Sequence, residues 1–291
     1  MTGQTVDRPF TSSPDAAPVE LGARFKSALH HALLLFLLLL TFFPFFIAIL
    51  TSLKSFQQLL SNFWLPAFPL QLHNYVMAWN EIYRSIINSS LVSLGAVAGV
   101  LLCASLASYA FARIDFAWRD GAYYLVLSLL MIPGVLTLIG RYLLIVQFGL
   151  MNSLWGLILP YIAGGLAFAV FLLTGFFSDL PEELFEAARM DGGTELQMYR
   201  LIALPLSRPI MAIVGLLTFL STWGDYVWPL LVLRSPEKFT LMLGLAKFTG
   251  NSQVMFGPLM AGYVIASVPT AIIIILMMRT FAGAALVGAF K

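Results

Sequence analysis

The chain has 291 residues, of which 60% are hydrophobic and 10% are charged, and its mean hydropathy is +0.89. These values lie outside the balance of a soluble globular domain, so we expect most of the chain to reside in lipid. The net charge is only +2 and no basic residues form a dense cluster, which argues against nucleic-acid binding. The single cysteine, Cys103, excludes an intrachain disulfide and is expected to be a small buried side chain.

The N-terminal segment, residues 1–28, is expected to be a cytoplasmic tail, because proline, serine and threonine are scattered through it. The first apolar run follows at residues 29–52 and is long enough to cross about 30 Å of hydrocarbon at about 1.5 Å per residue. A secretory signal is the alternative for this run. It is disfavoured because no small-residue cleavage site follows this run, and because further apolar runs follow it.

Further apolar runs predict an all-α, polytopic membrane protein with six transmembrane helices. The expected spans cover about residues 30–50, 86–111, 122–147, 154–177, 206–232 and 255–280. Residues 53–84 would then form an extracytoplasmic loop and residues 85–281 the transmembrane core. Residues 282–291 would form a C-terminal tail.

The distribution of lysine and arginine favours an orientation with both termini in the cytoplasm. In this topology the inner segments carry Arg8, Arg24, Lys26, Arg113, Arg119, Arg189, Arg200, Arg208, Arg279 and Lys291. The outer segments carry only Lys54, Arg84, Arg234, Lys238 and Lys247. The polar segment between the fourth and fifth spans, residues 178–205, is therefore expected to face the cytoplasm.

This polar segment carries the signals of two short helices. Asp179 with Glu182, and Thr194 with Gln197, have the three-residue spacing of capping boxes. Gly192 and the glycine after it supply the left-handed residue that ends the first helix.

The first of these helices, expected over residues 180–191, would present a flat face. Leu184, Ala187 and Ala188 share that face at three- and four-residue spacing. Small side chains let another backbone approach closely, and the carboxylates that flank the face can meet basic groups on a partner. The segment thus has the properties of a docking surface.

The spacing of Glu186-Ala187-Ala188, Gly192 and residues 202–205 (Ile-Ala-Leu-Pro) resembles the signature loop of binding-protein-dependent ABC import permeases. In that family the loop is the coupling helix, which docks into a groove on a separate ATP-hydrolysing subunit. The alternative is an ordinary amphipathic helix between two spans. The resemblance implies coupling roles for Glu186, Ala187, Ala188, Asp191, Gly192, Ile202 and Pro205.

From about Asn74 to Lys291 the chain is similar to the carbohydrate-uptake subfamily, the MalG-type permeases, which implies the type I ABC importer permease fold. The landmarks are Asn74-Tyr75, Asn88-Ser89, the run from Ala107 to Arg113, Met131-Ile132-Pro133, the run from Gly149 to Asn152, and Trp223-Gly224-Asp225. Three places depart from the usual pattern: Ala284, Gly140-Arg141-Tyr142 and Gly224. These departures affect substrate contacts rather than the class.

The resemblance also implies partners, cargo and location. The partners are a second, MalF-like permease subunit, two ABC ATPase subunits that carry ATP and Mg, and an extracytoplasmic solute-binding protein. The cargo would be a sugar, oligosaccharide or related polyol, moved by alternating access across a bacterial or archaeal inner membrane. The chain has no Walker A pattern, so another subunit must hydrolyse ATP. Metal-site and nucleophile motifs are also absent from the sequence, so we expect neither an enzyme nor a cofactor in this chain.

Four residues are candidates for the substrate pathway. Asp225 is the carboxylate inside a predicted span, and an ionisable group at membrane depth indicates function. Beside it, Trp223 and Tyr226 could pack on a sugar ring, and Arg141 could face a water-filled cavity. The alternatives are an outer interfacial position for Asp225 and its aromatic neighbours, and an Arg141 side chain that snorkels outward.

Three other functions remain open at this level. An ion-coupled secondary transporter would need several ionisable residues within the membrane or paired broken helices, and the chain offers one aspartate and one arginine. A purely structural membrane scaffold has no positive feature in its favour. An ABC import permease for amino acids or peptides is the third, because the carbohydrate assignment depends on the resemblance alone.

Overall fold

The computed structural model describes residues 19–250 and 255–288, with side chains described for residues 26–250 and 255–277. Every regular element within these ranges is helical, as the composition predicts. The chain divides into two compact units, Met1–Ile47 and Ala48–Lys291. The first long helix, α1 (Val19–Ser52), contains the boundary between them, and all other elements belong to the second unit.

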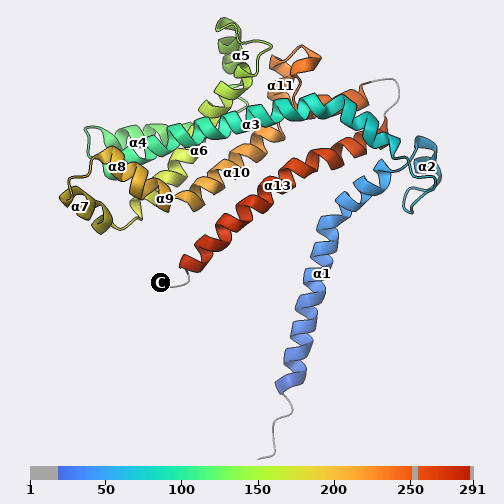
Figure 1. The fold of residues 1–291 in the computed structure, drawn as a ribbon, viewed down its shortest axis with the longest axis horizontal. Coiled ribbons are helices and arrows are strands. Elements are labelled where there is room, and N and C mark those ends of the chain that lie inside the picture. Colours follow the sequence, from blue (N-terminus) through green and yellow to red (C-terminus); the bar gives the residue numbers. More distant parts are fainter. Residues whose placement is uncertain (1–18, 251–254, 289–291) are drawn as a thin grey trace, which may run out of the picture. The chain divides into compact units, whose positions relative to one another are not determined.

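Four longer helices form the body of the second unit: α3 (His73–Arg113), α6 (Trp155–Ser178), α10 (Arg208–Trp223) and α13 (Phe256–Gly288). Figure 1 shows α3, α6 and α10 side by side, with α13 along the same group. Glycine permits part of this close packing, because a Cβ at Gly165 of α6 would lie 2.9 Å from a methyl group of Val100 on α3. Small residues allow helices to approach in this way in membranes.

Short elements connect these helices. The α-helical ones are α2 (Phe56–Ser61), α4 (Arg119–Ser128), α5 (Leu138–Gln147), α7 (Glu182–Met190), α8 (Glu195–Met198), α9 (Leu204–Leu206), α11 (Val227–Val232) and α12 (Leu241–Ala246). A π-helix covers Tyr199–Ala203, and 3-10 helices cover Leu129–Met131, Pro236–Lys238 and Lys247–Thr249. In Figure 1, α7, α8 and α9 lie at one end of the helix group, and α5 and α11 lie away from that end.

Within the described residues, four helices are long and apolar enough to cross a membrane: Lys26–Ser52, His73–Arg113, Trp155–Ser178 and Phe256–Met277. A fifth would be the pair Glu195–Leu206 and Arg208–Trp223, which is bent by 75°. The structure therefore confirms a chain with several apolar helices. The count of six spans and the side on which the termini lie stay predictions.

The third predicted span, residues 122–147, is not one continuous helix. Two ten-residue helices, α4 and α5, occupy this region, and residues 132–137 separate them. The reason is local, because Pro133 lacks an amide hydrogen and disfavours the α conformation of the residue before it. Ile132 accordingly has φ −86° and ψ 113°, which ends the helical path.

The fifth predicted span is also interrupted. Helix α10 ends at Trp223 and α11 begins at Val227, so residues 224–226 form a break inside the predicted range 206–232. The helix of the second span is longer than predicted. Helix α3 has 41 residues and is about 60 Å long at about 1.5 Å per residue. It begins at His73, inside the segment predicted as an extracytoplasmic loop. The expectation that Cys103 is buried is wrong, since its side chain is exposed on α3.

Candidate functional site

The polar segment of residues 178–205, hereafter the coupling loop, consists of α7 and α8 joined by a tight turn. The turn depends on Gly192, whose φ of +79° lies in the left-handed region that favours glycine. The amide of Gly192 donates to the carbonyl of Arg189 at 3.0 Å, and that of Gly193 to Ala188 at 2.8 Å. This pair of bonds is a Schellman motif, which confirms that glycine ends the first helix.

Of the two predicted capping boxes, one is confirmed and one is wrong. Thr194 accepts from the Gln197 amide, and the Gln197 side chain accepts from the Thr194 amide. Asp179 instead lies at the end of α6, and Pro181 precedes α7 without a side-chain cap. The Glu182 carboxylate is used elsewhere, because it binds two arginines.

One buried aromatic residue, Phe185, anchors α7 to the helix group. Its side chain is fully buried, and its ring centroid lies 6.4 Å from that of Tyr109 on α3. Ala188, one turn later, is partly buried against the same hydrophobic cluster. The predicted flat face is therefore divided, since Leu184 and Ala187 point outward while Ala188 packs inward. The sequence contained a signal for this anchor, because Phe185 and Ala188 are three residues apart.

The outer surface of the coupling loop combines apolar side chains, carboxylates and a hollow. The exposed large apolar side chains are Leu184, Met190, Leu196 and Leu201, and Met190 is 89% exposed. A hollow of about 340 Å³ lies between the two short helices, and it is lined by Ala188, Asp191, Gly192, Gly193, Gln197, Met198, Leu201 and Ile202. Four of the seven predicted coupling residues thus line one concave surface.

The other three predicted coupling residues lie around this hollow or beyond it. Glu186 and Ala187 are exposed on α7. Pro205 is exposed in α9, immediately after the π-helix Tyr199–Ala203. Proline cannot donate to the carbonyl four residues earlier, and a π-helical turn is one way in which a helix accommodates such a gap.

Arg113, the last residue of α3, holds the coupling loop against the helix group. Its side chain is only 6% exposed. The guanidinium donates to the carbonyl of Phe177 at 2.6 and 2.9 Å and to that of Leu180 at 2.5 Å, and it also pairs with Glu182. Its Cζ lies 4.3 Å from the centre of the Phe185 ring. A buried cation with all these partners joins the end of α6 to the start of α7.

A second arginine joins the two short helices of the coupling loop. Arg189 of α7 donates to Glu182 at 2.9 Å and lies 3.5 Å from Glu195 at the start of α8. The hydrogen bond to Glu182 raises the pKa of Arg189, with further contributions from the charges of both glutamates. These contacts fix α7 and α8 relative to each other.

The predicted pathway residues Asp225 and Arg141 are brought together by Trp228. Asp225 is half-buried in the break between α10 and α11, where it accepts from the amides of Val227 at 3.0 Å and Trp228 at 3.4 Å. It also accepts from the hydroxyl of Tyr161 on α6 at 2.8 Å. The Arg141 guanidinium carbon lies 4.2 Å from the centre of the Trp228 ring. Sequence analysis missed Tyr161 and Trp228.

This polar cluster borders an apolar hollow of about 640 Å³ between α5 and α6. Arg141 supplies its charged group, and Leu144, Phe148 and Leu159 are among its apolar lining. The Nε of Arg141 is buried and has no hydrogen-bond partner among the described residues. A guanidinium in such a position could bind a hydroxyl or carboxylate group of a solute.

The other two predicted pathway residues are close to Asp225 along the chain but differ in exposure. Trp223 is 5% exposed and stacks on Phe219 at 5.1 Å in a different hydrophobic cluster. It therefore offers little surface to a solute in this conformation. Tyr226 is 41% exposed in the break before α11.

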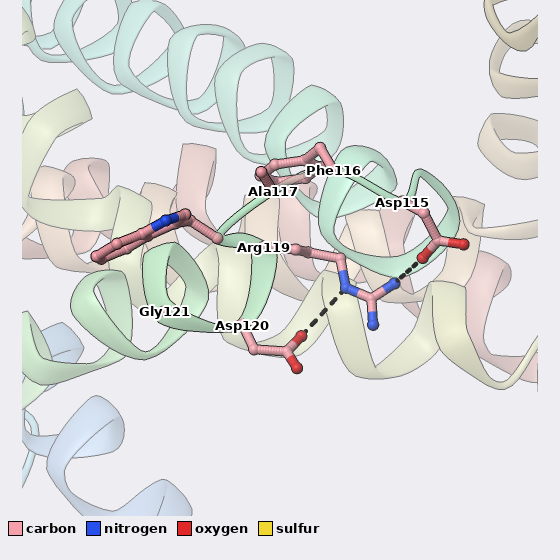
Figure 2. A pocket seen from close by; sticks show the side chains of 7 residues that line it. Asp115, Phe116, Ala117, Arg119, Asp120 and Gly121 are labelled. Atoms are coloured by element: carbon pink, nitrogen blue, oxygen red, sulfur yellow. Dashed lines mark hydrogen bonds and ion pairs between the residues drawn. The ribbon is translucent and has the colours of Figure 1, made fainter.

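A further pocket, of about 540 Å³, lies in the loop that follows α3 (Figure 2). Arg119 donates to Asp115 at 2.6 Å and to Asp120 at 3.1 Å there, so two carboxylates neutralise its charge. Trp118, in the left-handed region with φ 69°, is 87% exposed. The pocket is shallow and built from one short loop, and we assign it no ligand.

Comparison with known proteins shows which family this architecture belongs to. Residues 101–284 match the family described as binding-protein-dependent transport system inner membrane component. The diacetylchitobiose uptake system permease protein NgcG of Streptomyces coelicolor is 32% identical over 270 residues, covering 91% of this chain and 89% of NgcG. The galactooligosaccharides transport system permease protein GanQ of Bacillus subtilis is 33% identical over 269 residues, covering 90% of this chain and 94% of GanQ.

A solved structure has the same fold. It is the crystal structure of a bacterial ABC transporter involved in the import of the acidic polysaccharide alginate. The TM-score is 0.76 at 22% sequence identity, and the match covers 94% of this chain and 99% of the other. The family match over residues 101–284 includes the coupling loop, Arg141 and Asp225.

Proposed function

The chain belongs to the family of binding-protein-dependent transport system inner membrane components, and from this premise we propose that it is the permease subunit of an ATP-driven sugar importer. Members of this family are transport components of the inner membrane rather than enzymes, and they work within a multi-subunit system. The cargo we propose is a disaccharide or oligosaccharide, because both relatives named above carry such sugars.

The observation that carries this proposal is the outer surface of the coupling loop. It offers exposed apolar side chains around a hollow that four of the predicted coupling residues line. Exposed carboxylates flank this surface, so a partner with an apolar projection and basic neighbours would fit. We propose that this partner is one of two ABC ATPase subunits, each carrying ATP and Mg.

The mechanism we propose is alternating access. A second, MalF-like permease would enclose the path together with this chain, and an extracytoplasmic binding protein would deliver the sugar. Closure of the ATPase subunits around ATP would draw the two coupling loops together and open the path outward. ATP can drive this change only because it binds the two conformations with different affinity.

For the path itself we propose the cluster around Asp225 and Arg141, extended by Tyr161 and Trp228. The cluster combines a carboxylate, a hydroxyl, a guanidinium and an aromatic ring. A polyol matches these groups, since its hydroxyls can both donate and accept while its C–H face packs on a ring. The exposed Tyr226 could extend the same surface.

The proposed function is tested by purifying the complex from native membranes and measuring its ATPase rate with a panel of sugars. The panel contains diacetylchitobiose, galactooligosaccharides and an amino-acid mixture, each with the cognate binding protein. We expect an ATPase subunit in the complex and a rate that rises with a sugar but not with amino acids. A complex without an ATPase subunit, or uptake that stops when the proton gradient is collapsed with ATP preserved, would instead indicate a secondary transporter.

Replacement of Asp225 with asparagine tests the proposed path. The amide oxygen of asparagine can still accept from Val227 and Trp228, so the turn before α11 should persist. Hydrogen bonds to a charged group are stronger than neutral ones by about 1 kcal/mol, so we expect sugar affinity in uptake assays to fall about fivefold. Uptake kinetics equal to those of the wild type would mean that Asp225 only caps α11.

A further inference from the structure

One stripe of α3 contacts the coupling loop at three successive points. Ser105, Tyr109 and Arg113 are four residues apart, so they lie on one face of the helix. Each carries a polar group that faces the loop, although the surrounding residues of α3 are mostly apolar. The spacing is regular, and the loop residues that they contact come from three different parts of the loop.

The three contacts are all hydrogen bonds between side chains. The hydroxyls of Ser105 and Tyr199 lie 2.7 Å apart, and both groups are buried. The Tyr109 hydroxyl donates to the Glu195 carboxylate at 2.8 Å, and Arg113 pairs with Glu182. The loop partners thus belong to the π-helix, to the first residue of α8 and to the first turn of α7 respectively.

Ring packing supports the same contact. Tyr109 lies 5.3 Å from Tyr199, 6.2 Å from Phe177 and 6.4 Å from Phe185, measured between ring centroids. It is therefore at the centre of an aromatic cluster that joins α3, α6 and both halves of the loop. Figure 1 shows the matching arrangement of elements, with α7, α8 and α9 at one end of the helix group.

We propose that the stripe Ser105–Tyr109–Arg113 locks the coupling loop to α3, so that loop and helix move as one rigid body when the ATPase subunits close. This inference depends on the proposed function and adds the residues that transmit the movement. Tyr109 and Arg113 are positioning residues, because they act through the loop and contact neither ATP nor cargo. Arg189 completes the lock by joining Glu182 and Glu195.

The lock can be tested by the distance between two spin labels in the complete transporter. One label is attached to the native Cys103, which is exposed on α3, and the other to Glu183→Cys on the exposed side of α7. The partner subunits must lack cysteine. For the wild-type stripe we expect one distance population, unchanged between the nucleotide-free complex and the complex trapped with Mg-ATP and vanadate.

Two conservative variants then weaken the lock without removing a ring or a large volume. Tyr109→Phe removes one hydroxyl, and Glu195→Gln removes one charge. In each variant we expect one distance population in the nucleotide-free complex. After trapping with Mg-ATP and vanadate we expect a second distance population beside it. The double variant should go little further than Glu195→Gln alone, because that change weakens both the bond from Tyr109 and the ion pair with Arg189. The matched control is Tyr124→Phe, since Tyr124 is 68% exposed and its hydroxyl has no hydrogen-bond partner among the described residues.

The outcomes separate this inference from the proposed function. A wild-type complex that hydrolyses ATP but whose label distance changes on trapping would overturn the rigid lock alone. The rigid lock would also be overturned if the Tyr109→Phe and Glu195→Gln variants kept the single wild-type distance. The same holds if the Tyr124→Phe control showed the second distance population. A wild-type complex that contains no ATPase activity would overturn the proposed function, and the lock with it.

Discussion

Replacing Gly192 with valine is expected to reduce sugar uptake about tenfold while ATP hydrolysis continues. The φ of +79° at this residue is unfavourable for any side chain with a Cβ, and most unfavourable for a β-branched one. Such strain costs about 1–3 kcal/mol, which lowers the equilibrium population of the native turn about 5- to 150-fold. The measurement is the ratio of sugar transported to ATP hydrolysed in proteoliposomes.

The variant Gly192→Asn is the matched control for this substitution. A Cβ at position 192 would meet no atom within 4 Å in this chain, so backbone conformation rather than a clash decides the effect. Asparagine tolerates the left-handed region better than other residues, and we therefore expect it to retain most of the coupling. Equal transport by the valine, asparagine and wild-type proteins would show that the turn has no part in coupling.

Truncation of Phe185 to alanine should release α7 from the helix group and abolish most transport. Replacement of a buried phenylalanine by alanine costs about 3–5 kcal/mol, because it removes apolar contacts and leaves a cavity. Here it also removes the ring over which the Arg113 guanidinium lies at 4.3 Å. We expect faster proteolysis within residues 178–205 and a large fall in uptake, measured on the assembled complex.

The variant Phe185→Leu shows whether the effect of Phe185→Ala comes from lost apolar packing under α7 or from misfolding of the whole chain. Leucine keeps most of the apolar volume, so α7 should stay docked and uptake should stay within a few-fold of the wild type. A second control is Leu184→Ala, since Leu184 is 43% exposed and contributes little to the cluster under α7. If Phe185→Ala resists proteolysis and transports as the wild type does, the anchor assigned to Phe185 is wrong.

The two substitutions act on different properties of one loop. Gly192 decides whether α7 and α8 meet at the angle that forms the hollow of about 340 Å³. Phe185 decides whether this pair of helices is attached to α3 and α6 at all. We therefore expect a coupling loss from the first with an intact loop, and a protease-sensitive loop from the second. Measuring both proteolysis and uptake distinguishes these failures.

The sequence by itself determined the class of the protein and much of the coupling loop. The apolar composition required helices in lipid, because a backbone in hydrocarbon must satisfy its own hydrogen bonds. The capping box at Thr194 and the left-handed Gly192 were also predictable from the sequence. Both are local signals, since each depends on groups within about five residues along the chain.

Two of the predicted spans are not single continuous helices, for reasons that the sequence also contained. Pro133 interrupts the third span, and Asp225 caps a new helix inside the fifth by accepting from Val227 and Trp228. Average hydropathy gave these signals too little weight, because a single residue hardly changes the mean over 20 positions. Backbone hydrogen bonding, by contrast, responds to a single proline or a single carboxylate.

Only the tertiary structure decided which side chains hold the coupling loop and which surround Asp225. Tyr109 and Glu195 are 86 positions apart, Arg113 and Glu182 are 69 apart, and Tyr161 and Asp225 are 64 apart. Such pairs depend on how α3 and α6 pack, and no local spacing specifies that register. The outward face of α7 was therefore misassigned in part, whereas its turn was predicted correctly, because a turn depends on one φ angle and a docked face depends on every helix that surrounds it.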